Sequence, residues 1–211
     1  MYVDSKATTT KATNRHGLSW NNTDDSPVAS FSHLIRDGWK GDSRLTILPA
    51  ITSSQLAQVS SLMRSFVGWL RGRYDQEVWF IDDYFNHQSF ESELASLPGE
   101  YARPSGRLLL ARYRGEPAGC VAMRPLEKQT CEMKRMFVHP DFQGKRIGRR
   151  LAETLIEEAR KAGYRRIILD TGIRQVEAQR LYHRLGFEKI EPYYEIPEKV
   201  KSMLVFMALY L

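Results

Sequence analysis

The segment HPDFQGKRIGRRL, residues 139–151, combines glycines with basic side chains and is suited to binding a phosphate group. A strand that ends at Val138 and a helix that begins near Ile147 leave several backbone N–H groups without an intrahelical acceptor. These groups and the helix dipole form an anion site, and glycines let the backbone approach the oxygens. The candidate cofactor-binding residues of this loop are Gln143, Gly144, Lys145, Arg146, Ile147, Gly148 and Arg149.

The basic residues of this loop have a simpler explanation, which is a solvated basic turn ahead of an ordinary helix. Cations beside the positive end of a helix dipole are unfavourable unless an anion binds there. The clustering of Lys145, Arg146 and Arg149 therefore favours a ligand that carries phosphate groups.

The whole chain has the composition of a globular protein with room for a core. Of its 211 residues, 42% are apolar and 27% are charged, and the net charge is +6. No run of about 18 apolar residues is present, so we expect no membrane span. Two cysteines, Cys120 and Cys131, are too few for a disulfide framework or a metal cluster, and we expect a cytoplasmic protein without a metal.

The first 42 residues differ from the rest of the chain. They are rich in Thr, Ser, Asn and Asp and have no sustained apolar period, so we expect a mostly disordered extension at 1–42. A transit peptide is the alternative, which Asp4 and the acidic residues after it disfavour. The ordered domain is expected at 43–211.

The apolar patterns of residues 43–211 predict alternating strands and helices. Apolar residues recur at three and four positions over 53–72, which predicts an amphipathic helix. The aromatic stretch 74–88 is interpreted as a loop. The other expected elements are a strand at 44–51, a helix at 90–97, a hairpin at 107–126, a strand at 131–140, a helix at 147–162, a strand at 165–171, a helix at 175–185 and strands at 187–191 and 203–211. This order indicates a mixed α/β sheet of about seven strands.

Two motifs inside this order resemble those of the GNAT-type N-acetyltransferases, which use acetyl-CoA. Residues 143–148 are similar to the family loop Q/R-x-x-G-x-G/A, and LYHRLGF at 181–187 is similar to its LY-x-x-L-G-F segment. Between them, LDTGIRQVEAQ at 169–179 resembles the usual joint between a strand and a helix. The resemblance implies a GNAT-like, mostly antiparallel sheet with four helices and a splayed central β-α-β crossover.

The resemblance also implies acetyl-CoA as cosubstrate and places further cofactor contacts outside the loop. These are Met136, Phe137, Val138, Thr171, Gln175, Ala178 and Tyr182. Arg146 departs from the family pattern, which has glycine at this position. Our interpretation is that this position does not need a positive φ; the alternative is a distorted loop that binds the cofactor weakly.

Acetyl transfer to an amine requires a base for the ammonium, a donor for the acetyl carbonyl and an acid for the leaving thiolate. Glu132, on the strand before the loop, is the candidate catalytic base, with His139 as a minor alternative. Tyr182 is the candidate catalytic acid. The backbone N–H of Val138 or Phe137 is the expected carbonyl donor.

The acceptor amine is the part of the reaction that the sequence specifies least. The family frames it with the first helices and the last hairpin, which here makes Asp82, Asp83, Tyr84 and Tyr193 the candidate substrate-binding residues. We expect a small-molecule primary amine or an amino acid as acceptor, and a monomer or homodimer. A protein or peptide N-acetyltransferase and a non-catalytic acyl-CoA-binding module are the alternatives. No motif of a dedicated nucleic-acid binder is present.

Overall fold

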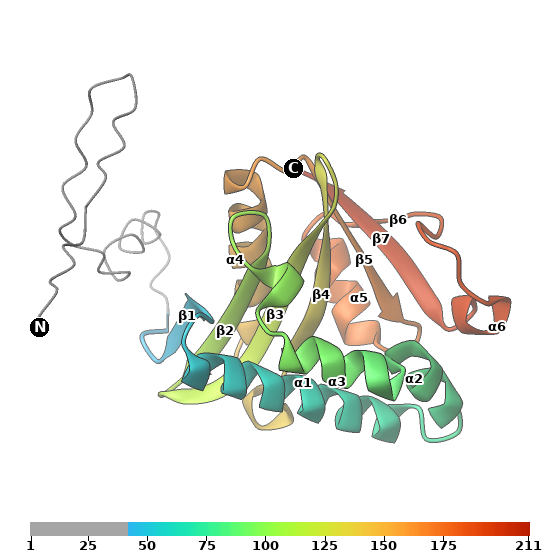
Figure 1. Ribbon diagram of the computed structural model, residues 1–211, viewed down its shortest axis with the longest axis horizontal. Helices are drawn as coiled ribbons and strands as arrows, with labels where there is room; N and C mark the ends of the chain where they lie inside the picture. The colour runs from blue at the N-terminus through green and yellow to red at the C-terminus, as the bar shows by residue number, and fades with distance from the viewer. Residues whose placement is uncertain (1–41) are drawn as a thin grey trace, which may run out of the picture. The chain divides into compact units, whose positions relative to one another are not determined.

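One seven-stranded sheet forms the centre of the part of the chain that the computed structural model describes, residues 42–211 (Figure 1). The expected disordered extension lies outside these residues, apart from Asp42. The strands are β1 (Leu45–Pro49), β2 (Arg107–Tyr113), β3 (Glu116–Glu127), β4 (Thr130–Val138), β5 (Arg166–Gly172), β6 (Glu188–Lys189) and β7 (Leu204–Tyr210). Their order is β1-β2-β3-β4-β5-β7-β6, and only β4 and β5 pair in parallel. The predicted mixed, mostly antiparallel sheet is confirmed.

Within residues 42–211, six α-helices accompany the sheet, where the sequence patterns predicted four. They are α1 (Ser53–Arg73), α2 (Val78–Phe85), α3 (His87–Ala95), α4 (Ile147–Lys161), α5 (Val176–Arg184) and α6 (Glu198–Lys201). The interpretation of 74–88 as a loop was wrong, because most of it is helix α2. This helix buries Phe80, Ile81 and Phe85, and Glu77 before it makes no side-chain capping bond, so no start signal is present in the sequence.

The helices cover both faces of the sheet (Figure 1). Two apolar clusters of buried residues lie between the helices and the sheet. Helices α1, α2 and α3 pack on one face, where Leu110 and Phe137 point. Helices α4 and α5 pack on the other, against Leu109 and Met133. This alternation follows from the period of two in a strand. No helix within residues 42–211 is both long and apolar enough to cross a bilayer.

The two parallel strands β4 and β5 separate soon after they begin. They pair only where Thr130 to Glu132 meet Arg166 to Ile168, whereas β4 continues beside β3 as far as Val138 and β5 continues beside β7 as far as Gly172. A register shift in the β3–β4 ladder opposes two residues of β4, Arg135 and Met136, to one of β3. The predicted splayed crossover is therefore present as β4-α4-β5.

Candidate active site between two splayed strands

The gap between β4 and β5 forms a cleft, which α1 and α2 close from one face of the sheet. Its walls combine residues of the β4 bulge, the end of β5 and the start of α5. Residues that matter for its chemistry are Arg135, Met136, Asp170, Thr171, Gln175 and Tyr182. Four of the predicted cofactor contacts, Met136, Thr171, Gln175 and Tyr182, are thus brought together.

The end of β4 presents a backbone donor toward this gap. The His139 N–H donates to the Ala118 carbonyl at 2.9 Å, across the ladder with β3. Donors alternate along an antiparallel strand, so the preceding N–H, that of Val138, points away from β3 toward the side of β5. The ladder with β5 has already ended at Glu132, so no strand accepts this N–H. Its direction fits the expected carbonyl donor.

The predicted cofactor loop connects β4 to α4 and has two residues in the left-handed region. Gly144 has φ of 76° and Arg146, directly before α4, has φ of 59°. The interpretation that the Arg146 position does not need a positive φ was wrong. The turn into α4 requires that conformation, and this chain adopts it with a side chain present, at a cost of about 1 kcal/mol or more.

Helix α4 starts without a capping side chain, so the N–H groups of its first turn lack a protein acceptor. The side chain of Ile147 is 1% exposed and anchors this turn in the core. Gly148 lies beside the cleft, because a Cβ on it would be 3.6 Å from the Met136 methyl carbon. An uncapped helix start beside left-handed residues suits a diphosphate, so the loop fits the phosphate part of acetyl-CoA.

The basic side chains of the loop have different surroundings. Lys145 donates to the Asp141 carbonyl at 2.9 Å and lies 5.8 Å from the ring centre of Tyr113. Arg149 forms an exposed ion pair with Glu153 at 2.7 Å. Arg146 is exposed. Within the described residues no ion pair engages Arg146, so its charge is available to a phosphate.

Tyr182 lies on α5 with its ring in the core and its side chain lining the cleft. Burial, reinforced by the negative charge of Asp170, raises the pKa of its hydroxyl. The phenol is therefore protonated at neutral pH, as a proton donor must be. Its ring packs against Phe187 of the same predicted motif, at 5.6 Å between ring centres.

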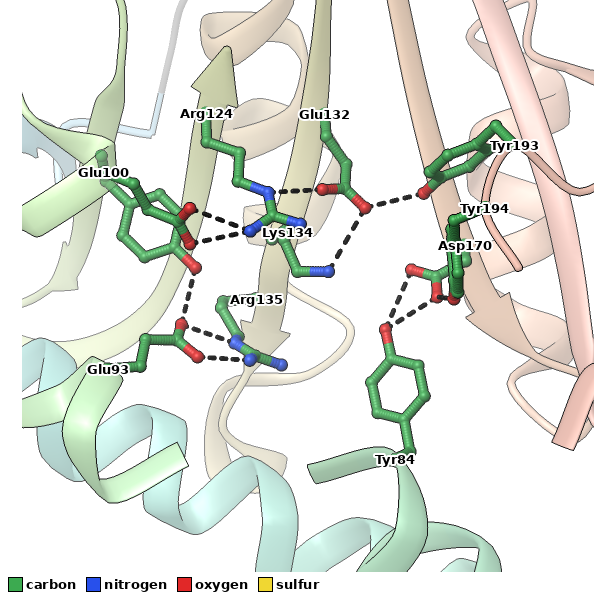
Figure 2. A network of polar contacts seen from close by, with 11 residues as sticks. Tyr84, Glu93, Glu100, Arg124, Glu132, Lys134, Arg135, Asp170, Tyr193 and Tyr194 are labelled. Atoms are coloured by element: carbon green, nitrogen blue, oxygen red, sulfur yellow. Dashed lines mark hydrogen bonds and ion pairs between the residues drawn. The ribbon is translucent and has the colours of Figure 1, made fainter. Parts of the chain in front are cut away.

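Glu132 is 1% exposed and has three partners that satisfy its carboxylate. Arg124 Nε lies 2.6 Å and Lys134 Nζ 3.3 Å from its oxygens, and the Tyr193 hydroxyl donates to it at 2.8 Å (Figure 2). Burial alone would raise its pKa, but the charges of Lys134 and Arg124 outweigh burial and lower it. These contacts disfavour a role of Glu132 as the catalytic base, and that role stays a prediction.

A second hollow adjoins the cleft and contains all four predicted acceptor residues. Tyr84, Lys134 and Arg135 line both, so the two spaces share a wall. Of the predicted acids, Asp82 pairs with Arg71 at 2.7 Å and Asp83 pairs with Lys199 at 2.8 Å, and both carboxylates are about half exposed. Their charges are thus already compensated at the surface.

The sequence patterns missed Asp170, which lies near the end of β5 in the same cleft. Tyr84 and Tyr194 both donate hydrogen bonds to its carboxylate, at 2.8 Å and 2.6 Å (Figure 2). The one available signal was an acidic residue directly after the apolar run IIL within the strand.

Comparisons with known proteins agree with this arrangement. The model of the Acetyltransferase (GNAT) family matches residues 66–187. An uncharacterized N-acetyltransferase of Schizosaccharomyces pombe is 39% identical over 112 residues, which are 52% of this chain and 69% of that protein. Across the first three curated relatives, the chain covers 69%, 61% and 56% of their lengths.

Solved structures show the same fold. An acetyltransferase of Streptococcus agalactiae has a TM-score of 0.62 at 20% identity, and the match covers 80% of this chain and 99% of that one. The PaiA N-acetyltransferase of Thermoplasma acidophilum, solved in complex with coenzyme A, has a TM-score of 0.60 at 14% identity, over 79% of this chain and 99% of that one.

Proposed function

Because this chain belongs to the GNAT acetyltransferase family and uses acetyl-CoA, we propose that it transfers the acetyl group directly to the primary amine of a small molecule or an amino acid. Acetyl-CoA supplies the activated acetyl thioester. The observation that carries the proposal is that the cleft lined by the β4 bulge and Tyr182 adjoins the acceptor hollow.

Different residues of the chain take part in different steps of acetyl transfer. The N–H groups at the start of α4, with Gly144 and Arg146, hold the diphosphate. The Val138 N–H donates to the acetyl carbonyl oxygen, which becomes negatively charged during attack. Tyr182 donates its proton to the sulfur that leaves. Gln175 lines the cleft and holds the turn after β5, since its side-chain oxygen accepts from the Gly172 N–H at 2.8 Å.

A contact between α2 and α6 supports a small acceptor. Lys199 of α6 pairs with Asp83 of α2 at 2.8 Å and lies 4.8 Å from the ring centre of Trp79. Asp83 and the neighbouring Pro197 both line the acceptor hollow. This contact bridges one rim of the hollow, which limits entry by a folded protein more than entry by a metabolite.

Direct transfer is supported by the state of the cysteines. Cys120 and Cys131 are both buried, and burial raises the pKa of each thiol to about 12. A thiol rather than a thiolate is a poor nucleophile, so an acetyl-cysteine intermediate is disfavoured.

An acceptor screen tests the proposal. Thiol release from acetyl-CoA is followed with the full chain against amino acids, polyamines, aminoglycosides and short peptides. We expect release with one of the small amines and little with peptides. Release with peptides alone would replace the proposal by peptide acetylation, and no release with any amine would leave acyl-CoA binding as the function.

A further inference from the structure

Asp170 carries a negative charge that no cation of the described chain compensates. The buried or half-buried glutamates of residues 42–211 are each paired with arginine, as Glu93 with Arg135, Glu132 with Arg124 and Glu158 with Arg107. In the same residues, no arginine, lysine or histidine lies within ion-pair distance of Asp170, and its partners are two neutral phenols. A carboxylate that lines a cleft without a cationic partner is suited to a cationic ligand.

The two phenols come from opposite sides and hold the carboxylate in one orientation. Tyr84 reaches it from α2, with its oxygen 3.0 and 2.8 Å from the two carboxylate oxygens (Figure 2). Tyr194 reaches it from the segment between β6 and β7, at 2.6 Å. The two phenols have one O–H proton each, so they leave lone pairs free on the carboxylate, whose two oxygens offer about four acceptor sites.

The charge of Asp170 acts on the whole cleft. Burial first, and then this negative charge, raise the pKa values of Tyr84, Tyr182 and Tyr194. Asp170 and Tyr182 line the same cleft as the β4 bulge, while Tyr84 and Tyr194 also line the acceptor hollow. Asp170 therefore stands where the acceptor hollow meets the reaction site.

We propose that Asp170 is the acceptor subsite of this enzyme: it binds the ammonium group of a cationic amine and takes its proton, with Tyr84 and Tyr194 as positioning residues. This inference rests on the proposed function and specifies its substrate as an amine that is charged at neutral pH. Glu132, which already has three partners, then serves to place Tyr193, Arg124 and Lys134 around the hollow.

The protons balance in this scheme. One ammonium proton passes to Asp170, and the freed nitrogen lone pair forms a bond to the acetyl carbon. As the carbon–sulfur bond breaks, Tyr182 gives its proton to the sulfur, and the remaining excess proton on nitrogen restores Tyr182. Asp170 releases its proton to water, so one proton leaves for each amide formed.

The test compares two acceptors of the same carbon skeleton, an alkylamine and an alkoxyamine, because the alkoxyamine is uncharged at neutral pH. With Asp170→Asn, we expect kcat/KM for the alkylamine to fall about 100-fold or more, the usual contribution of a general base. The fold-decrease in kcat/KM for the alkoxyamine should be at least about tenfold smaller, because an uncharged acceptor needs neither ammonium binding nor prior deprotonation. Asp170→Glu should recover part of the alkylamine activity.

Asp75→Asn is the matched control, because Asp75 is exposed and lies outside the cleft. Thermal stabilisation by acetyl-CoA should be the same in Asp170→Asn as in the wild type, which shows that the variant is folded. If it does not fold, Tyr84→Phe and Tyr194→Phe test the same subsite, and each should reduce alkylamine activity more than alkoxyamine activity.

Equal losses for both acceptors, or no loss for either, would overturn the role of Asp170. A wild-type enzyme that acetylates no amine at all would instead overturn the proposed function, so the two failures are distinguishable.

Discussion

Glu93 of α3 and Arg135 of the β4 bulge form a two-pronged ion pair that joins the helix to the strand (Figure 2). Arg135 has φ of 56°, a left-handed conformation that costs a non-glycine residue energy. Its Nε donates to Glu93 at 2.8 Å, and its guanidinium lies 4.9 Å from the ring centre of Phe85. The Tyr101 hydroxyl donates to the same carboxylate at 2.6 Å. These contacts hold the bulge and therefore the strand end that carries the Val138 N–H.

Replacing Glu93 by Gln should therefore loosen both the fold and the site. A buried Arg135 without its counter-charge costs about 3–5 kcal/mol of unfolding free energy, measured by urea denaturation. Glu91→Gln is the matched control on the same helix. Glu91 pairs with Arg64 at an exposed site, so its change should cost less than about 1 kcal/mol. Similar losses in both variants would show that the buried pair has no special role.

The phenol of Tyr182 should be needed for turnover and not for cofactor binding. Tyr182→Phe keeps the ring in the core and removes the proton donor, so kcat should fall by about 100-fold. The affinity for acetyl-CoA, measured by calorimetry, should change little. Unchanged turnover would remove Tyr182 from the mechanism.

The order of elements and the cofactor loop were predictable because they depend on local patterns. The apolar period of 53–72 and the glycines around 144–148 lie close together in sequence, and the family match confirms the resemblance that they support. Helix α2 was missed because it is only eight residues long, Asp82 and Asp83 interrupt its apolar residues, and no capping residue precedes it. Such a short segment has no clear period and resembles a packed loop.

Arg146→Gly should stabilise the protein, because glycine adopts the left-handed conformation without the steric cost of a Cβ. We expect a gain of about 1 kcal/mol, seen as a higher melting temperature. Lys145→Gly is the control next to it. Lys145 has no positive φ, so its change should bring no gain. Acetyl-CoA affinity of the Arg146 variant should fall by no more than a few-fold, because one exposed charge is lost while the backbone N–H groups that bind the diphosphate remain.

Protonation of Glu158 in acid should lower the free energy of unfolding. Burial would raise the pKa of this carboxyl, but its hydrogen bonds with Arg107 and Lys161 lower it below 4.5. A depressed pKa stabilises the folded state above the unfolded-state value, and this contribution is lost as the pH falls below about 4.5. Stability should therefore fall in acid.

In Glu158→Gln that contribution is absent. The variant should be less stable than the wild type at pH 7, and its free energy of unfolding should depend less steeply on pH below about 4.5. Urea denaturation at neutral and acid pH checks both statements, with the exposed neighbour change Glu157→Gln as control. Parallel pH profiles for the wild type and Glu158→Gln would contradict the assignment.

The acceptor site was less predictable than the cofactor loop because its residues come from distant parts of the chain. Asp170, Tyr84 and Tyr194 meet only after β5, α2 and the β6–β7 connection have packed together. Asp82 and Asp83 were predicted to bind the acceptor, but the fold supplies each with a cation from another segment. Pairing of this kind depends on tertiary contacts that local sequence does not encode.

Mass spectrometry of one reaction tests the central claim most directly. The full chain is incubated with acetyl-CoA and the small amine that gives the fastest thiol release, and both the amine and the protein are analysed. We predict that the amine carries one acetyl group on nitrogen and that the protein carries none. An unmodified amine, or an acetyl group retained on Cys120 or Cys131, would contradict direct transfer to a small amine.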